Sequence, residues 1–142
     1  MEQPITLSPP IRMVIGSTEC YRCGQPFEVA GVVGTVEEEG HEDIALLMYI
    51  EELPEEVLGL VQERVPGFKW VYSATAGHRY YGNVCPSCNG LAGDHHLRTP
   101  GAVFFPMDEQ AEAELSSELL PVDHPIRVRS SYGMSGWMER LA

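Results

Sequence analysis

Cys20-Tyr-Arg-Cys-Gly24 and Cys85-Pro-Ser-Cys-Asn-Gly90 contain all four cysteines of this 142-residue chain. In each stretch the cysteines are three positions apart, and a glycine or asparagine follows the second one. Residues that tolerate a positive φ permit a tight turn whose backbone N–H groups face the sulfurs. Each stretch is therefore interpreted as a zinc knuckle. The predicted ligands of one structural zinc ion are Cys20, Cys23, Cys85 and Cys88.

Other uses of paired cysteines explain the sequence less well. A thioredoxin-like redox site needs only one Cys-x-x-Cys, and structural disulfides belong mainly to secreted proteins. An iron–sulfur cluster uses the same thiolate ligands and stays an alternative. The 61 residues between Cys23 and Cys85 exceed the about 15 to 20 found in compact zinc ribbons. Because the entropy of loop closure grows only logarithmically with length, such an insertion is tolerable.

The rest of the sequence predicts a single zinc-stabilised α+β domain that covers residues 1–142. Short strands are predicted by valine-rich and aromatic runs at residues 11–15 (after a break at Pro9-Pro10), 27–36, 44–50, 68–73, 78–83, 102–105 and 126–130, the last as an edge strand. Helices are predicted at 54–65 and at 108–120, the latter with Asp108 or Met107 near its N-cap. The predicted fold is a small mixed or antiparallel sheet with one to three helices, cross-linked by zinc.

The order of knuckle, hairpin, second Cys-x-x-Cys and short helix resembles that of zinc-ribbon and treble-clef proteins. The resemblance covers both knuckles, the hairpin at 70–83 and residues 89–97. The chain also resembles small uncharacterised bacterial zinc proteins, in which an aromatic hairpin precedes Cys-Pro-x-Cys and a Gly-Asp follows shortly after. This resemblance implies that the four cysteines bind metal, and it implies no activity.

Asp94, His95 and His96 follow the second cysteine pair and are the candidate catalytic residues. Four thiolates complete the coordination of zinc, whereas a catalytic zinc keeps one position open for water. A zinc deaminase would place a proline before its Cys-x-x-Cys rather than inside it. An HNH-type nuclease would place Asp-His between the cysteine pairs. The chain is therefore predicted not to be an enzyme, although a second metal site or an active site at these residues stays an alternative.

Acidic residues outnumber basic residues, and the net charge is -12. Residues 37–63 contain ten acids and neither lysine nor arginine. Such a field repels a phosphate backbone and favours encounter with a basic protein, although a solvated face is the simplest explanation of an acidic run. Residues 37–43 are predicted to form an acidic loop. Its predicted partner-binding residues are Glu37, Glu38, Glu39, Glu42 and Asp43.

These features predict a non-enzymatic, zinc-stabilised module that binds a basic protein. A concrete form is a bacterial immunity or inhibitor protein that neutralises a basic toxin or effector. The alternative is a regulatory zinc finger that binds nucleic acid, which requires a cluster of arginines on one face. The candidate arginines are Arg12, Arg22, Arg79, Arg98, Arg127 and Arg129. Neither a signal peptide nor a membrane-spanning stretch is recognised, so a cytoplasmic location without membrane contact is expected.

Overall fold

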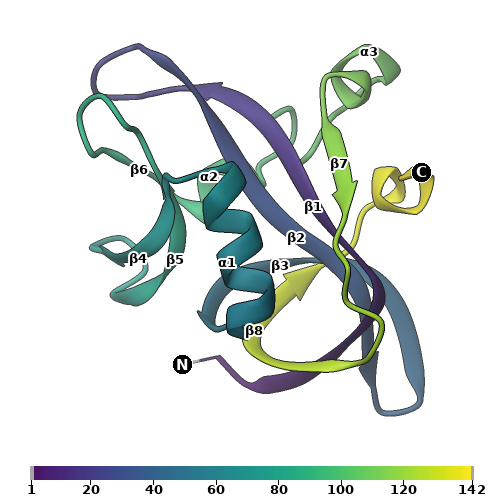
Figure 1. Cartoon of the computed structure of the whole chain (residues 1–142). Helices are drawn as coiled ribbons and strands as arrows, with labels where there is room; N and C mark the ends of the chain where they lie inside the picture. The colour runs from purple at the N-terminus through teal and green to yellow at the C-terminus, as the bar shows by residue number, and fades with distance from the viewer. Residues whose placement is uncertain (1, 142) are drawn as a thin grey trace.

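The computed structural model describes residues 2–141 and consists mainly of β-strands (Figure 1). Strands account for 49% of the chain and helices for 17%, so the predicted α+β fold of treble-clef or zinc-ribbon type is wrong. The structure instead contains a closed antiparallel barrel of four strands, with further strands attached to it.

The barrel is made of β1 (Pro4–Glu19), β2 (Pro26–Glu38), β3 (His41–Glu52) and β8 (Ile126–Gly133). β1 pairs with β2, β2 with β3, β3 with β8 and β8 with β1, all antiparallel. The closing pair joins residues 4–7 to residues 126–129, at opposite ends of the chain. Local sequence patterns carry no signal for so distant a pair, which is why the sequence indicates strands but not the barrel.

β1 changes its partner halfway along its length. Residues 4–7 pair with β8, whereas residues 12–15 pair with β7 (Ser116–Leu119). Pro9-Pro10 lies between them, at a register shift in the pairing with β2. Proline has no N–H group to donate to a strand ladder, and an irregular position tolerates its absence. The predicted break is therefore a bulge inside a longer strand. The predicted edge strand at 126–130 is also wrong, because β8 lies between β1 and β3.

A smaller antiparallel sheet beside the barrel is made of β4 (Phe68–Ser73), β5 (His78–Val84) and β6 (Leu91–Ala92). β4 and β5 form the predicted hairpin. One strand pair, Ile50 of β3 opposite Tyr81 of β5, connects this sheet to the barrel. Side-chain contacts must therefore supply most of the connection between the two β-structures.

The helices are short. α1 (Glu55–Arg64) confirms the helix predicted at 54–65 and buries Val57, Leu58 and Val61. The others are α2 (Asp94–Leu97), α3 (Glu109–Ala113) and the 3-10 helix η1 (Gly136–Arg140). None of the helices within residues 2–141 combines the length and apolarity that crossing a membrane requires.

Two predictions for the C-terminal half are corrected by tertiary structure. Of the two predicted N-cap residues, Asp108 is the N-cap, and its carboxylate accepts a hydrogen bond from the Ala111 N–H at 2.7 Å. The helix nevertheless ends at Ala113, because residues 116–119 pair with β1 as β7. Residues 102–105 form turns instead of a strand, and the Phe104 N–H bonds to the Leu97 carbonyl at 2.9 Å.

The central strands are buried on both faces. Met13, Val32 and Leu47 pack in one core cluster with α1, whereas Val14 and Val33 belong to a second cluster with Cys85. Successive residues of a strand point to opposite faces, so burial on both sides explains the unbroken valine-rich run of β2.

Truncation of Leu7 should show how much the barrel interior contributes to stability. Leu7 is fully buried and Leu119 is 59% exposed. We expect Leu7→Ala to lower the free energy of unfolding by about 3 kcal/mol, because it leaves a cavity. The same change at Leu119 should alter it by less than about 0.5 kcal/mol. Denaturant unfolding followed by circular dichroism measures both, and equal effects would contradict the burial of β1.

Candidate metal centre

The structure brings the four cysteines together. Their sulfur atoms all lie within 4.8 Å of one another, and none is in a disulfide. Cys20 Sγ is 3.4 Å from Cys88 Sγ, and Cys23 Sγ is 3.7 Å from Cys85 Sγ. In a tetrahedral site with metal–sulfur bonds of about 2.3 Å, sulfurs are separated by about 3.8 Å. The four cysteines are therefore positioned to bind one metal ion.

The two knuckles have the same backbone geometry. The Gly24 N–H bonds to the Cys20 carbonyl at 2.9 Å, and the Asn89 N–H bonds to the Cys85 carbonyl at 2.8 Å. Gly24 and Asn89 both have positive φ, at 76° and 63°. Glycine and asparagine suit these two positions, because few other residues adopt a positive φ without strain.

Backbone donors favour a thiolate at Cys20. The backbone N–H of Cys23, together with that of Arg22, lowers the pKa of Cys20 to about 6. The pKa of Cys23 is raised to about 11: the Gln25 N–H lowers it, but desolvation and the thiol groups of Cys85 and Cys20 outweigh that effect. Without a cation, the neighbouring thiols therefore do not all ionise together. A divalent cation stabilises all four thiolates at once.

The site joins the two β-structures. Its first knuckle connects β1 to β2 in the barrel, and its second knuckle connects β5 to β6 in the smaller sheet. Cys20 and Cys85 are buried in a core cluster, whereas Cys23 is exposed. A metal ion bound here cross-links the two sheets, which is the function of a structural metal.

Asn83 forms a second connection between the sheets. Its side-chain oxygen accepts a hydrogen bond from the Ala30 N–H at 2.8 Å, and its NH₂ group donates to the Ala30 carbonyl at 3.0 Å. The amide therefore pairs with the β2 backbone as a neighbouring strand would. Asn83 is 2% exposed, so the loss of either bond would leave a buried polar group unsatisfied.

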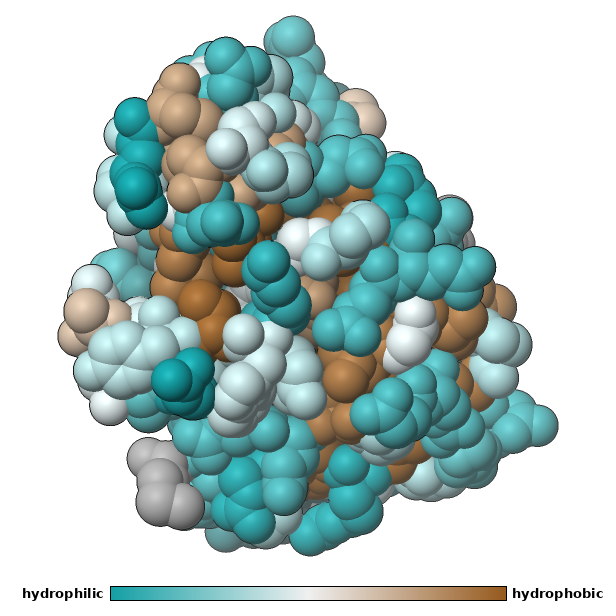
Figure 2. All heavy atoms as spheres, turned by 60° about the vertical axis from the view of Figure 1, so that its left-hand side comes forward, coloured by the Kyte–Doolittle hydropathy of each residue, from teal (hydrophilic) through white to brown (hydrophobic). Residues whose placement is uncertain are grey.

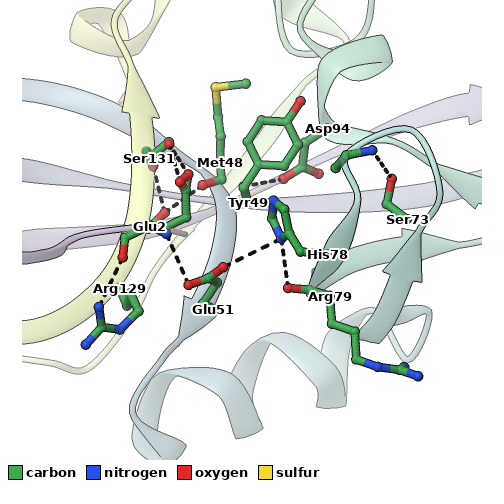
Figure 3. A network of polar contacts seen from close by, with 12 residues as sticks. Glu2, Met48, Tyr49, Glu51, Ser73, His78, Arg79, Asp94, Arg129 and Ser131 are labelled. Atoms are coloured by element: carbon green, nitrogen blue, oxygen red, sulfur yellow. Dashed lines mark hydrogen bonds and ion pairs between the residues drawn. The ribbon is translucent and has the colours of Figure 1, made fainter.

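Asp94 forms a third connection (Figure 3). Its Oδ2 accepts a hydrogen bond from the Tyr49 N–H at 2.8 Å, and its own N–H donates to the Tyr80 hydroxyl at 3.2 Å. Tyr49 has φ 52° and lies where the β3–β8 register shifts. A bulky residue with this φ is strained, and the Asp94 carboxylate helps to hold it there.

Arg98 lies near Asp94. Its Nε and Nη1 atoms are buried and have no hydrogen-bond partner within residues 2–141. Both residues line a small cavity of about 10 Å³, which is large enough for a single water molecule. Burial raises the pKa of Asp94 to about 7, although the Tyr49 N–H and the Arg98 charge lower it. The role of Asp94 has no signal in the sequence beyond the short Gly93-Asp94 motif.

His95 and His96 are exposed on α2 and do not converge with Asp94 on a metal site. Within residues 2–141, the four cysteines are the only group of three or more His, Cys, Asp or Glu side chains that lie close enough together to hold a metal ion. The second metal site that the sequence left open at Asp94, His95 and His96 is therefore not formed by the described residues.

The predicted acidic loop is the tip of a β-hairpin. β2 extends to Glu38 and β3 begins at His41, so only Glu39 and Gly40 form the turn, both with positive φ. A two-residue turn of this kind matches the twist of paired strands. Glu37, Glu38, Glu39, Glu42 and Asp43 are all exposed at this tip.

Comparisons of the chain with protein-family models, with curated proteins and with solved structures found no match. The four-cysteine cluster is the part of the zinc-ribbon and treble-clef resemblance that the structure supports. Its ligands lie on loops of two different sheets, whereas the surrounding fold is a barrel.

Loss of the metal should destabilise the protein strongly, because metal-binding energy at such a site is folding energy. We expect one metal ion per chain. Cys85→Ser and Cys23→Ser should each remove it and lower the melting temperature by at least about 10 °C. Elemental analysis and thermal unfolding measure the two effects.

The comparison of these two variants separates metal binding from packing. Cys85 is buried, but Cys23 is exposed and has little packing to lose. Ser87→Ala, at an exposed position between the second pair, is the matched control and should retain the metal. A Cys23→Ser variant that melts at the wild-type temperature would show that no metal cross-links the sheets.

Asp94 should make the stability depend on pH near neutrality. Because its pKa is raised to about 7 in the folded protein, the folded state binds a proton that the unfolded state releases near pH 4. This stabilisation is lost as the pH rises through 7. Asp94→Asn lacks it, so the free energy of unfolding of the wild type should fall by about 1 kcal/mol relative to the variant between pH 6 and 8.5. Parallel pH profiles for the two metal-bound proteins would refute this.

Proposed function

We propose that this protein is a non-enzymatic, zinc-stabilised module that presents its acidic hairpin to a basic protein. The acidic hairpin comprises Glu37, Glu38, Glu39, Glu42 and Asp43. The observation that supports this proposal is that none of the ion pairs within residues 2–141 includes any of these five acids. The hairpin lies at the lower right of Figure 1, away from the knuckle that joins β1 to β2.

Several acids elsewhere on the surface are paired with an arginine. Glu28 pairs with Arg64 at 2.9 Å, Glu52 with Arg129 at 3.1 Å, and Glu112 pairs with Arg140. The acidic hairpin has no comparable cation, so its field is not neutralised within the described part of the chain. An unneutralised field of one sign accelerates encounter with a surface of the opposite sign.

The hairpin also keeps like charges opposite each other. Glu37 and Glu42 are cross-strand partners, and such a pair is destabilising. Two acids are nevertheless oriented: Glu37 accepts a hydrogen bond from the Ser8 hydroxyl at 2.5 Å, and Glu38 accepts one from the Tyr132 hydroxyl. A cationic partner would relieve the repulsion between carboxylates that are already held in place.

Zinc is the metal we propose for the four-cysteine site. Four thiolates in a tetrahedron suit zinc, which has no redox chemistry and serves as a closed structural centre. Elemental analysis that returned iron and sulfide would replace zinc with an iron–sulfur cluster. Reduced thiols are maintained in the cytoplasm, and a cytoplasmic location is part of this proposal.

The concrete form that we propose is a bacterial immunity or inhibitor protein that neutralises a basic toxin or effector. The alternative, a nucleic-acid-binding zinc finger, needs several free arginines on one face. Two of the candidate arginines do not fit that requirement, because Arg129 is paired with Glu52 and the guanidinium of Arg98 is partly buried. A basic protein is therefore favoured as the partner.

Neutralising the acidic hairpin should weaken capture of the partner without unfolding the protein. The test variant carries Glu37→Gln, Glu38→Gln, Glu39→Gln, Glu42→Gln and Asp43→Asn. It should be at least as stable as the wild type, because the repulsion between Glu37 and Glu42 is removed. In pull-downs from source-cell lysate the wild type should capture a basic protein. At 0.1 M salt the variant should associate with that protein at least about tenfold more slowly than the wild type. At 1 M salt the difference between the two association rates should be smaller.

A control with the same change in net charge isolates the hairpin. Five exposed acids elsewhere form no ion pair within residues 2–141 and are replaced by glutamine in this control: Glu55, Glu63, Glu109, Glu114 and Glu139. If both five-residue variants lose the partner equally, net charge rather than the hairpin is responsible. If the wild type shifts duplex DNA at physiological salt, the nucleic-acid alternative replaces this proposal.

A further inference from the structure

A second pocket lies beside the metal centre and apart from the acidic hairpin. It has a volume of about 620 Å³, which is within the range of small-ligand sites. Three regions line it: Tyr49 in β3, the hairpin of β4 and β5, and residues 91–96, with Tyr21 of the first knuckle at its side. Figure 2 views the molecule from the side on which β4, β5 and β6 lie in Figure 1, and hydrophobic residues are visible there between hydrophilic ones.

Tyrosine rings form much of this pocket, which we call the tyrosine pocket. Its rings are those of Tyr21, Tyr49, Tyr72 and Tyr80. Tyr49 and Tyr80 pack edge to face with ring centroids 5.1 Å apart, whereas Tyr21 and Tyr72 are 73% and 54% exposed. Two large aromatic side chains that remain this exposed beside a cavity offer ring surface to a ligand.

The charges in the lining favour a cation. Asp94 lines the pocket together with His95 and His96, and no lysine or arginine of residues 2–141 is among the lining residues. The Asp94 carboxylate has no ion pair within 4.0 Å in residues 2–141, and one of its oxygens is used by the Tyr49 N–H. Arg98 offsets part of this charge from the other side, where it lines a separate cavity. The electronegative tyrosine faces must therefore supply most of the attraction.

One of these rings already binds a cation from this chain. The Arg79 guanidinium carbon lies 5.8 Å from the centre of the Tyr72 ring. That distance is within the range of a cation–π interaction.

We propose that the tyrosine pocket binds an alkylated ammonium group. Such an ion combines a positive charge with an apolar surface, and it matches aromatic walls with a single carboxylate better than a strongly hydrated primary ammonium does. The group is either a free small molecule or the end of a modified lysine side chain, and both present the same chemistry. This site is independent of the acidic hairpin.

The probes are choline and its uncharged isostere 3,3-dimethylbutan-1-ol, titrated into the metal-bound protein. Two-dimensional ¹⁵N NMR reports on the amides of Tyr49, Tyr72 and Gly93. We expect saturable shifts with choline and an affinity at least about tenfold weaker for the isostere. Equal affinities, or no saturable shift with choline, would overturn the proposal. Saturable binding of adenosine without binding of choline would overturn it in favour of a planar aromatic ligand.

Two exposed aromatic residues on the same strand provide matched variants. Tyr72 lines the pocket, whereas Trp70 is 46% exposed on β4 and does not. Tyr72→Ala should weaken choline binding about tenfold, and Trp70→Ala should leave it unchanged. Asp94→Asn should also weaken it. Unchanged binding by Tyr72→Ala would place the cation elsewhere and overturn the assignment.

The source of the ammonium group is resolved by a third probe. A peptide that contains trimethyl-lysine is compared with choline and with the same peptide carrying unmodified lysine. Tighter binding of the trimethylated peptide than of choline assigns the group to a protein side chain. Tighter binding of choline assigns it to a small molecule. Preference for the unmodified lysine peptide over both would contradict selection for alkylation.

Discussion

The structure depends on cross-links between two β-structures that share a single strand pair, Ile50 opposite Tyr81. A small sheet connected in this way would separate easily from the barrel. Apolar packing of Phe68 and Ala92 into the barrel core and three further contacts prevent this: the four-cysteine site, the Asn83 amide on the Ala30 backbone, and the Asp94 carboxylate on the Tyr49 N–H. All three use side chains from residues 83–94. This segment of the sequence therefore positions the barrel against the smaller sheet.

The sequence predicts elements whose signals are local. The helix at 54–65 and the hairpin of β4 and β5 are confirmed because apolar spacing, turn residues and caps act within a few residues. The barrel could not be predicted, because its closing pair joins residues near the two ends of the chain. β7 was not predicted because it also depends on pairing with a distant strand, β1. Residues 116–119 follow a good helix start, but pairing with β1 outweighs their helix propensity.

The candidate site was predictable to the same extent. Cys-x-x-Cys followed by glycine or asparagine indicates both the metal-binding thiols and the tight turn that directs them. The four-cysteine cluster could therefore be predicted from two short stretches of sequence. Asn83 and Asp94 were not predictable, because each bonds to backbone groups of a distant strand and backbone groups leave no mark in the sequence. A tyrosine with positive φ at position 49 runs against residue preference, and only tertiary contacts specify it.

The two proposed binding surfaces depend on different forces. The acidic hairpin is held by its own strand ladder, from Val33 opposite Leu46 to Glu38 opposite His41, and needs no contact with the metal centre. The tyrosine pocket is built from β3, the β4–β5 hairpin and the segment after the second knuckle, so its shape requires that the barrel and the small sheet stay joined. Loss of the metal should therefore disturb the pocket before the hairpin. On these two proposals, a metal ion at the four-cysteine site would bear on ligand recognition by holding Asp94 and the tyrosines in position, although its coordination would be closed to substrates.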